Sequence, residues 1–141
     1  MKQLITILFV GLISFSAFAQ DKVAKIEFDS DTIDYGTIEK GADGVRTFKF
    51  KNTGNAPLII TKVKSSCGCT VPKKPEDPIM PGMTGEITVK YDTERVMPFR
   101  KTITVTSNAE TPIVALKIKG TVVDSNKTSV LEKKSKSLIE Q

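Results

Sequence analysis

The chain has 141 residues and a formal net charge of +5, and it contains no histidine, no tryptophan and two cysteines. The absence of histidine excludes the usual Ser-His and Cys-His catalytic arrangements and removes the commonest zinc ligand. The positive charge comes mostly from lysines at alternating positions, whereas a nucleic-acid groove needs clustered arginines interleaved with aromatic residues. The composition therefore argues against both histidine-dependent catalysis and nucleic-acid binding.

Residues 1–19 have the pattern of an export signal. Lys2 gives a positive start, residues 4–15 are mostly apolar, and Ala17-Phe18-Ala19 is the small-residue pattern that precedes signal-peptidase cleavage. The apolar run is too short to span a membrane. We therefore expect a mature chain that begins near Gln20, has no transmembrane segment, and resides in the periplasm or at the cell surface.

The mature part, roughly 120 residues, is long enough for one domain and one core, which we place at residues 20–123. Its first strand pattern comprises Ile26 and Phe28, which alternate with charged residues. An acidic turn follows, and then a second short pattern from Ile33 to Ile38. This break predicts a first strand that passes from one sheet to the other.

The most informative stretch contains two strand patterns in succession. Phe48 and Phe50 alternate with polar residues, as in a strand with one buried face. Asn52–Pro57 is rich in turn-forming residues. Leu58–Ser65 is β-branched and aliphatic, and its change of phase predicts a bulge near Thr61. We expect these two strands to pair as a hairpin.

The next stretch, Val71 to Gly85, contains four prolines and predicts a surface connection, not a helix or a central strand. Alternating apolar patterns then recur up to Val122, and no helical period appears between Gln20 and Asp124. These patterns predict a two-sheet antiparallel sandwich of six or seven strands. We expect one core made of Phe48, Phe50, Leu58, Ile60, Ile87, Val89, Ile103, Val105, Leu116 and Ile118.

Residues 124–141 form a polar tail that we expect to be disordered or weakly helical. Its apolar residues Val130, Leu131, Leu138 and Ile139 have a spacing that would allow an amphipathic turn to dock on a partner. Because the tail has no strand pattern, we expect that its removal leaves the fold intact.

Several segments together resemble a known family: IDYGTI at 33–38, TFKFKNTGNAPL at 47–58, SCGCTVP at 66–72, the Pro81-Gly82 turn and KTITVTSN at 101–108. Over most of residues 26–122 they resemble a secreted bacterial family of unknown function, similar to the immunoglobulin-like domains of Hydin and the major sperm proteins. The resemblance implies an immunoglobulin-like sandwich of about seven strands. Tyr35 departs from the family pattern, in which Phe is more common. A fold of this kind does not supply a function.

Cys67-Gly68-Cys69 is the chemically distinctive motif, and we expect it at the rim of the sandwich. One interpretation is a tight structural turn, with or without a local disulfide. The loop that such a disulfide closes is so short that the bond would stabilise the fold by only about 1.5 kcal/mol. A second is a pair that exchanges disulfides with other thiols. A third is a thiolate site for a soft metal such as Cu(I), and a fourth is pairing with another chain. The residues alone leave these alternatives open.

The sequence thus predicts an exported, non-enzymatic interaction or scaffold module, with no cofactor and no metal. We expect a protein partner, bound by strand addition at an exposed sheet edge. The alternative is a thiol–disulfide redox or soft-metal-binding protein that uses Cys67 and Cys69.

Overall fold

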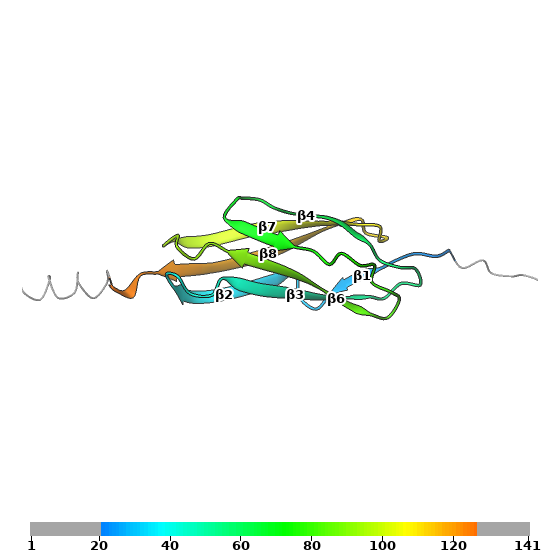
Figure 1. The fold of residues 1–141 in the computed structure, drawn as a ribbon, viewed down its shortest axis with the longest axis horizontal. Coiled ribbons are helices and arrows are strands. Elements are labelled where there is room, and N and C mark those ends of the chain that lie inside the picture. The colour runs from blue at the N-terminus through cyan, green and yellow to red at the C-terminus, as the bar shows by residue number, and fades with distance from the viewer. Residues whose placement is uncertain (1–20, 127–141) are drawn as a thin grey trace, which may run out of the picture.

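The computed structural model describes residues 21–126, so the expected signal segment and residues 127–141 lie outside this range. The described residues contain no helix that is long and apolar enough to cross a membrane. Eight strands run along the long axis of the domain (Figure 1): β1 (Ile26–Phe28), β2 (Thr32–Glu39), β3 (Val45–Asn52), β4 (Ile60–Ser65), β5 (Thr70–Lys73), β6 (Thr84–Tyr91), β7 (Pro98–Ser107) and β8 (Ile113–Val123).

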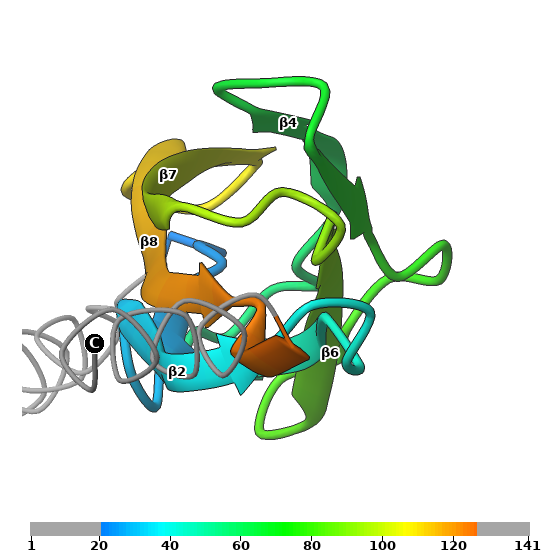
Figure 2. The ribbon, with the colours of Figure 1, turned by 90° about the vertical axis from the view of Figure 1, so that its left-hand side faces the viewer.

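The strands form two facing sheets, with the orders β1-β3-β6-β5 and β2-β8-β7-β4. Figure 2 shows these two layers from the end of the domain. All strand pairs are antiparallel except β2 with β8, which is parallel. The predicted two-sheet sandwich is confirmed, and so is the first strand that changes sheets, because β1 and β2 lie in different layers.

The strand that the sequence did not predict is β5, which contains Pro72. The Asp92 N–H donates to the Cys69 carbonyl at 2.9 Å. Hydrogen-bonded pairs alternate along an antiparallel ladder, so Val71 also bonds to β6 while Pro72 faces the open side. A proline is tolerated there because no neighbouring strand on the open side requires a backbone N–H from this position. The segment expected as a surface connection therefore begins with an edge strand.

The predicted hairpin of residues 45–72 is wrong. Strand β3 pairs with β1 and β6, whereas β4 pairs with β7 in the other sheet. The segment between them crosses from sheet to sheet, and within it Leu58 forms an isolated bridge with Ile79. The predicted bulge is confirmed, because the β4–β7 register shifts between Ile60 and Lys62.

The core lies between the sheets and contains every residue that the alternating patterns selected. Each of the ten predicted core residues is at most 4% exposed. The patterns missed an aromatic cluster at one end of the sandwich, made by Tyr35, Tyr91 and Phe99. Tyr91 and Phe99 stack with ring centroids 3.7 Å apart, and Tyr35 packs edge-on against Phe99 at 5.3 Å.

The two tyrosines of this cluster differ in their hydrogen bonding. The Tyr35 hydroxyl donates to the Gly44 carbonyl at 2.9 Å, and burial raises the pKa of Tyr35 to about 12. The Tyr91 hydroxyl is buried without a hydrogen-bond partner among the described residues. Burial also raises the pKa of Tyr91. Both phenols therefore stay protonated at neutral pH, but only one of them contributes a hydrogen bond.

Asn52 is fully buried and connects three segments of the chain. Its side-chain amide donates to the carbonyls of Ala56 and Ile79, each at 2.8 Å. Its oxygen accepts from the backbone N–H groups of Gly54 at 3.0 Å and Lys25 at 3.4 Å. These bonds explain why the segment after β3 crosses between sheets and does not form a hairpin turn.

The neighbouring Gly54 and Asn55 complete this arrangement. A Cβ at Gly54 would lie 2.3 Å from the Val23 carbonyl oxygen, so only glycine allows this close approach. The Asn55 side-chain oxygen accepts from the Val23 N–H at 2.7 Å. The Asn-Thr-Gly-Asn sequence therefore holds the N-terminal segment against the domain.

We expect Asn52→Leu to lower the free energy of unfolding by about 3 kcal/mol, because the variant loses all four hydrogen bonds of the buried amide. The Ile79 carbonyl keeps its bond from the Leu58 N–H, whereas no other bond is seen for the Ala56 carbonyl among the described residues. The matched control is Asn55→Ala, which removes two exposed hydrogen bonds, with the Val23 N–H and the Asp21 carbonyl, and should cost only about 1 kcal/mol. Urea denaturation of both variants measures the difference. Equal losses would contradict the central role of the Asn52 amide.

We expect Tyr91→Phe to be neutral or stabilising, because it removes a buried hydroxyl that has no partner among the described residues. Tyr35→Phe serves as the comparison and should cost about 1 kcal/mol, because it removes a formed hydrogen bond. Thermal melts of the two variants test this order. A Tyr91→Phe protein that melts below Tyr35→Phe would show that the Tyr91 hydroxyl has a partner in solution.

Candidate functional site

The Cys-Gly-Cys motif lies where the chain passes from the edge of one sheet to the edge of the other. Strand β4 ends at Ser65, and β5 begins at Thr70. Ser66 extends the ladder of β4, because its N–H donates to the Thr102 carbonyl at 2.9 Å and its hydroxyl accepts from the Thr102 N–H at 3.2 Å. Both β4 and β5 are outermost strands, so the motif is at the rim of the sandwich.

In the structure Cys67 and Cys69 are joined by a disulfide, with their Cα atoms 5.3 Å apart. Residues two apart in an extended strand are separated by about 6.6 Å, so the chain is drawn in at Gly68. A Cβ at Gly68 would meet nothing within 4 Å. The tip of this small ring therefore faces open space.

The two cysteines have unequal surroundings. Cys69 is 6% exposed and belongs to the buried core, whereas Cys67 is only partly buried and packs against that core. The Thr70 hydroxyl oxygen lies 3.8 Å from the Cys67 sulfur and 4.0 Å from the Cys69 sulfur. The backbone N–H of Cys67 donates to the Ser65 hydroxyl at 3.3 Å. Cys69 is thus the more sheltered residue of the pair, and Cys67 is the more exposed one.

Asp92 lies beside the motif through its backbone, which bonds to the Cys69 carbonyl. Its carboxylate accepts from Arg95 Nε at 3.0 Å and from the Glu94 N–H at 3.2 Å. The Arg95 guanidinium and the Glu94 N–H lower the pKa of the Asp92 carboxyl. This carboxylate is therefore ionised and bound to Arg95, which makes it a poor base for a nearby thiol.

Exposed residues around the motif include an apolar side chain on β5 and two basic side chains on β4. Val71 in β5 is 66% exposed. Lys62 and Lys64 in β4 are exposed and pair across the ladder with Thr106 and Thr104. Neither lysine forms an ion pair with any residue in the range 21–126. This edge of the domain therefore carries uncompensated positive charge.

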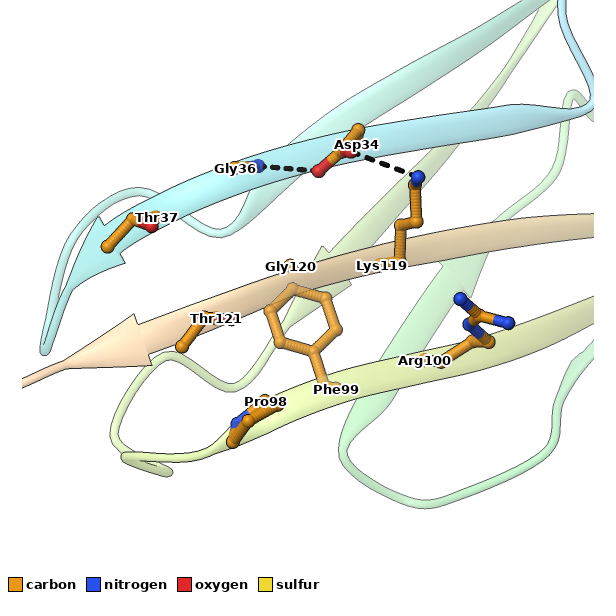
Figure 3. A pocket seen from close by; sticks show the side chains of 9 residues that line it. All are labelled: Asp34, Gly36, Thr37, Pro98, Phe99, Arg100, Lys119, Gly120 and Thr121. Atoms are coloured by element: carbon orange, nitrogen blue, oxygen red, sulfur yellow. Dashed lines mark hydrogen bonds and ion pairs between the residues drawn. The ribbon is translucent and has the colours of Figure 1, made fainter.

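A shallow groove of about 520 Å³ lies elsewhere, on the outer face of β2, β8 and β7 (Figure 3). Asp34 pairs there with Lys119 at 3.1 Å and accepts from the Gly36 N–H at 2.8 Å. The Gly36 N–H and Lys119 lower the pKa of Asp34. Asp34, Gly36 and Lys119 thus bind one another, and Arg100 projects from β7 beside them. The groove contains neither a nucleophile paired with a base nor a second carboxylate.

Among the described residues, no three His, Cys, Asp or Glu side chains lie close enough to hold a metal ion. The disulfide also occupies both sulfurs, and the thiolate is the form that binds soft metals. The Cys-Gly-Cys crossover therefore remains the candidate site, with chemistry restricted to sulfur.

The chain belongs to the family described as "Protein of unknown function (DUF1573)", which matches residues 26–122. No curated protein matches it. The resemblance to a family of unknown function that the sequence motifs suggested is confirmed by this match.

Similar solved structures share the fold. A protein of unknown function from Porphyromonas gingivalis W83 has a TM-score of 0.65 at 18% identity, covering 77% of this chain and 51% of that one. The chain thus spans about half the length of this relative. The ASH / PapD-like domain 7 of human CEP192 has a TM-score of 0.60 at 8% identity, covering 77% and 92%.

A third similar structure is the Vibrio cholerae VesB protease, with a TM-score of 0.53 at 11% identity, covering 70% of this chain and 32% of that one. At such low identities these likenesses show the fold alone. The domain is accordingly an immunoglobulin-like β-sandwich, as predicted.

We expect the double variant Cys67→Ser, Cys69→Ser to remain folded and to lose no more than about 2 kcal/mol, because the disulfide closes a very short loop. Thermal and urea unfolding, with and without reductant, measure this cost. Failure of the variant to fold would show that the crossover depends on the bond.

Proposed function

We propose that this DUF1573 protein is an exported, non-enzymatic module that binds an extended, acidic segment of a protein partner along the free edge of β4. The observation that carries the proposal is the orientation of the backbone N–H and C=O groups of β4. Ser66 donates to the Thr102 carbonyl, and hydrogen-bonded pairs alternate along the ladder. Val63 and Ser65 therefore turn their N–H and C=O groups away from β7, toward the open side.

The other three edges are less suited to an added strand. Strand β1 has only three residues, and Pro72 removes an N–H from the open side of β5. In β2 the register breaks between Asp34 and Thr37, and the Gly36 N–H is bound to the Asp34 carboxylate. Strand β4 keeps an unbroken register from Lys62 to Ser65, at the outer side of its layer (Figure 2).

The positive charge on β4 indicates which side chains a partner segment should carry. Lys62 and Lys64 lie on the solvent face of β4, where side chains of an added strand would be their direct neighbours. Opposite charges on adjacent strands attract, and like charges repel. A segment with Asp or Glu at alternating positions therefore fits this edge best. Strand addition is a recurring mode of peptide recognition by sheet edges.

Export is part of the proposal and is supported by the signal-like pattern of residues 1–19. A disulfide is also typical of proteins outside the cytoplasm, since thiols are kept reduced inside it. The PapD-like domain of CEP192 and the protein from Porphyromonas gingivalis share the architecture.

A second candidate function is thiol–disulfide exchange at Cys67 and Cys69. The observation that favours it is the partial exposure of Cys67 beside a buried Cys69. An accessible disulfide is the more labile kind, whereas a structural staple is usually sheltered.

A photo-crosslinking amino acid at position 64 tests the main proposal in the organism's own envelope. We expect crosslinks to a partner from this position and not from position 49, which lies on the outer face of the opposite sheet. Val63→Pro should abolish them, because it removes an N–H that faces the open side. The double variant Lys62→Glu, Lys64→Glu should weaken them by charge repulsion. Crosslinks that persist in a folded Val63→Pro protein, or that are equal at positions 49 and 64, would refute the proposal.

A further inference from the structure

The two cysteines of the crossover disulfide differ in burial, and this difference bears on which sulfur an incoming thiolate reaches. An incoming thiolate must approach along the line of the S–S bond, from behind the sulfur that it attacks. Cys69 is 6% exposed and packs in the core, which disfavours the approach of a thiolate to its sulfur. Cys67 is only partly buried, and a Cβ added at the neighbouring Gly68 would meet nothing within 4 Å. Attack is therefore directed to Cys67.

We propose that Cys67 is the sulfur through which this protein exchanges disulfides with a cysteine-containing segment bound at β4, and that Cys69 is the leaving group. This inference rests on the main proposed function for the position of the partner and on the second candidate function, thiol–disulfide exchange, for the reaction. Its chemical part, the inequality of the two sulfurs, does not depend on that position.

The position of the motif matches such a substrate. The open backbone groups of β4 end at Ser65, and Cys67 follows two residues later. A strand added to β4 would continue past Ser65 and bring its next side chains beside the Cys67 sulfur. Holding the thiol there raises its effective concentration relative to a free thiol in solution.

The reaction balances as two exchanges. The partner's thiolate attacks the Cys67 sulfur, a partner–Cys67 disulfide forms, and the Cys67–Cys69 bond breaks, leaving Cys69 as a thiolate that takes a proton from water. A second thiolate of the partner then attacks the partner's sulfur in this mixed disulfide and releases Cys67. The partner dithiol loses two electrons and becomes a disulfide, and the Cys67–Cys69 pair becomes a dithiol.

Thr70 contributes to the first exchange through its hydroxyl. Its oxygen lies 3.8 Å from the Cys67 sulfur and 4.0 Å from the Cys69 sulfur, so it can turn to Cys69 once Cys67 is bonded to the partner. The residue is only 3% exposed, so water does not compete for it freely. A hydroxyl can rotate to donate to a sulfur that becomes negatively charged. Burial alone would disfavour the Cys69 thiolate, and this donor offsets part of that cost.

The first test uses glutathione and the oxidised full-length chain. Tandem mass spectrometry of the trapped mixed disulfide should place glutathione on Cys67. Reduced single-cysteine variants give a second readout: Cys69→Ser, which retains Cys67, should react with an aromatic disulfide reagent at least about tenfold faster than Cys67→Ser. Glutathione on Cys69, or equal rates in the two variants, would overturn the inference. The mapping needs no substitution, so it stands even if a variant does not fold.

The second test separates the chemistry from the binding edge. A short synthetic peptide of alternating Glu and Val with one terminal Cys should attack the disulfide at least about tenfold faster than glutathione. Val63→Pro should remove this advantage, so that the peptide and glutathione attack the variant at similar rates. If glutathione is found on Cys67 but the peptide reacts no faster than glutathione, the assignment of Cys67 is supported and the proposed binding along β4 is refuted. If the peptide binds β4 but neither thiol attacks Cys67, the edge holds and the exchange is wrong.

Discussion

The buried amide of Asn52 is the interaction on which the arrangement of this domain depends. It lies at the end of β3 in one sheet, yet it binds the carbonyls of Ala56 and Ile79 and the N–H of Lys25. A buried polar group must find partners, and this one finds them in three separate segments. The amide therefore fixes where the N-terminal segment enters, where the chain leaves β3, and where it returns before β6.

This constraint determines the position of β4. Because the segment after β3 is held by Asn52 and passes to the opposite sheet, β4 is placed at the edge of the β2-β8-β7-β4 layer. The Cys-Gly-Cys crossover then returns the chain to the first sheet as β5. Two crossings, one on each side of β4, leave a single strand whose open edge ends at a disulfide. The proposed binding edge and the proposed exchange site are thus consequences of one chain path.

The crossover brings together few kinds of reactive group, and this limits the reactions that the site can support. The described residues bring together no metal-ligand cluster, and the Asp92 carboxylate near the motif is bound to Arg95. What remains is a backbone edge flanked by Lys62 and Lys64, and a disulfide between a buried and a partly buried cysteine. Both features act on an extended polypeptide: the first can bind its backbone, and the second can react with its thiol.

The sequence by itself determined the fold class and the core, because both depend on local alternation. Phe48, Ile87 and Leu116 lie in strands whose apolar residues recur at every second position. Such residues all lie on one face of the strand, so that face is the one that is buried. The bulge near Thr61 was also readable, because it appears as a change of phase in one segment. The position of Cys67 and Cys69 after a strand and before a proline-rich segment was enough to place them at the rim.

Only the tertiary structure decided which strands are neighbours. The turn-forming residues Asn52 to Pro57 favour a hairpin when they are considered alone, but the Asn52 amide binds groups distant in sequence, such as Ile79. The presence of Pro72 argued against a strand, because a proline has no N–H to donate to a neighbouring strand. The sequence does not tell that this position faces the open edge of the sheet, where no donor is needed. The unequal burial of Cys67 and Cys69 likewise depends on the packing of both sheets. Local pattern specifies what a segment buries, whereas partners distant in the chain specify where it lies.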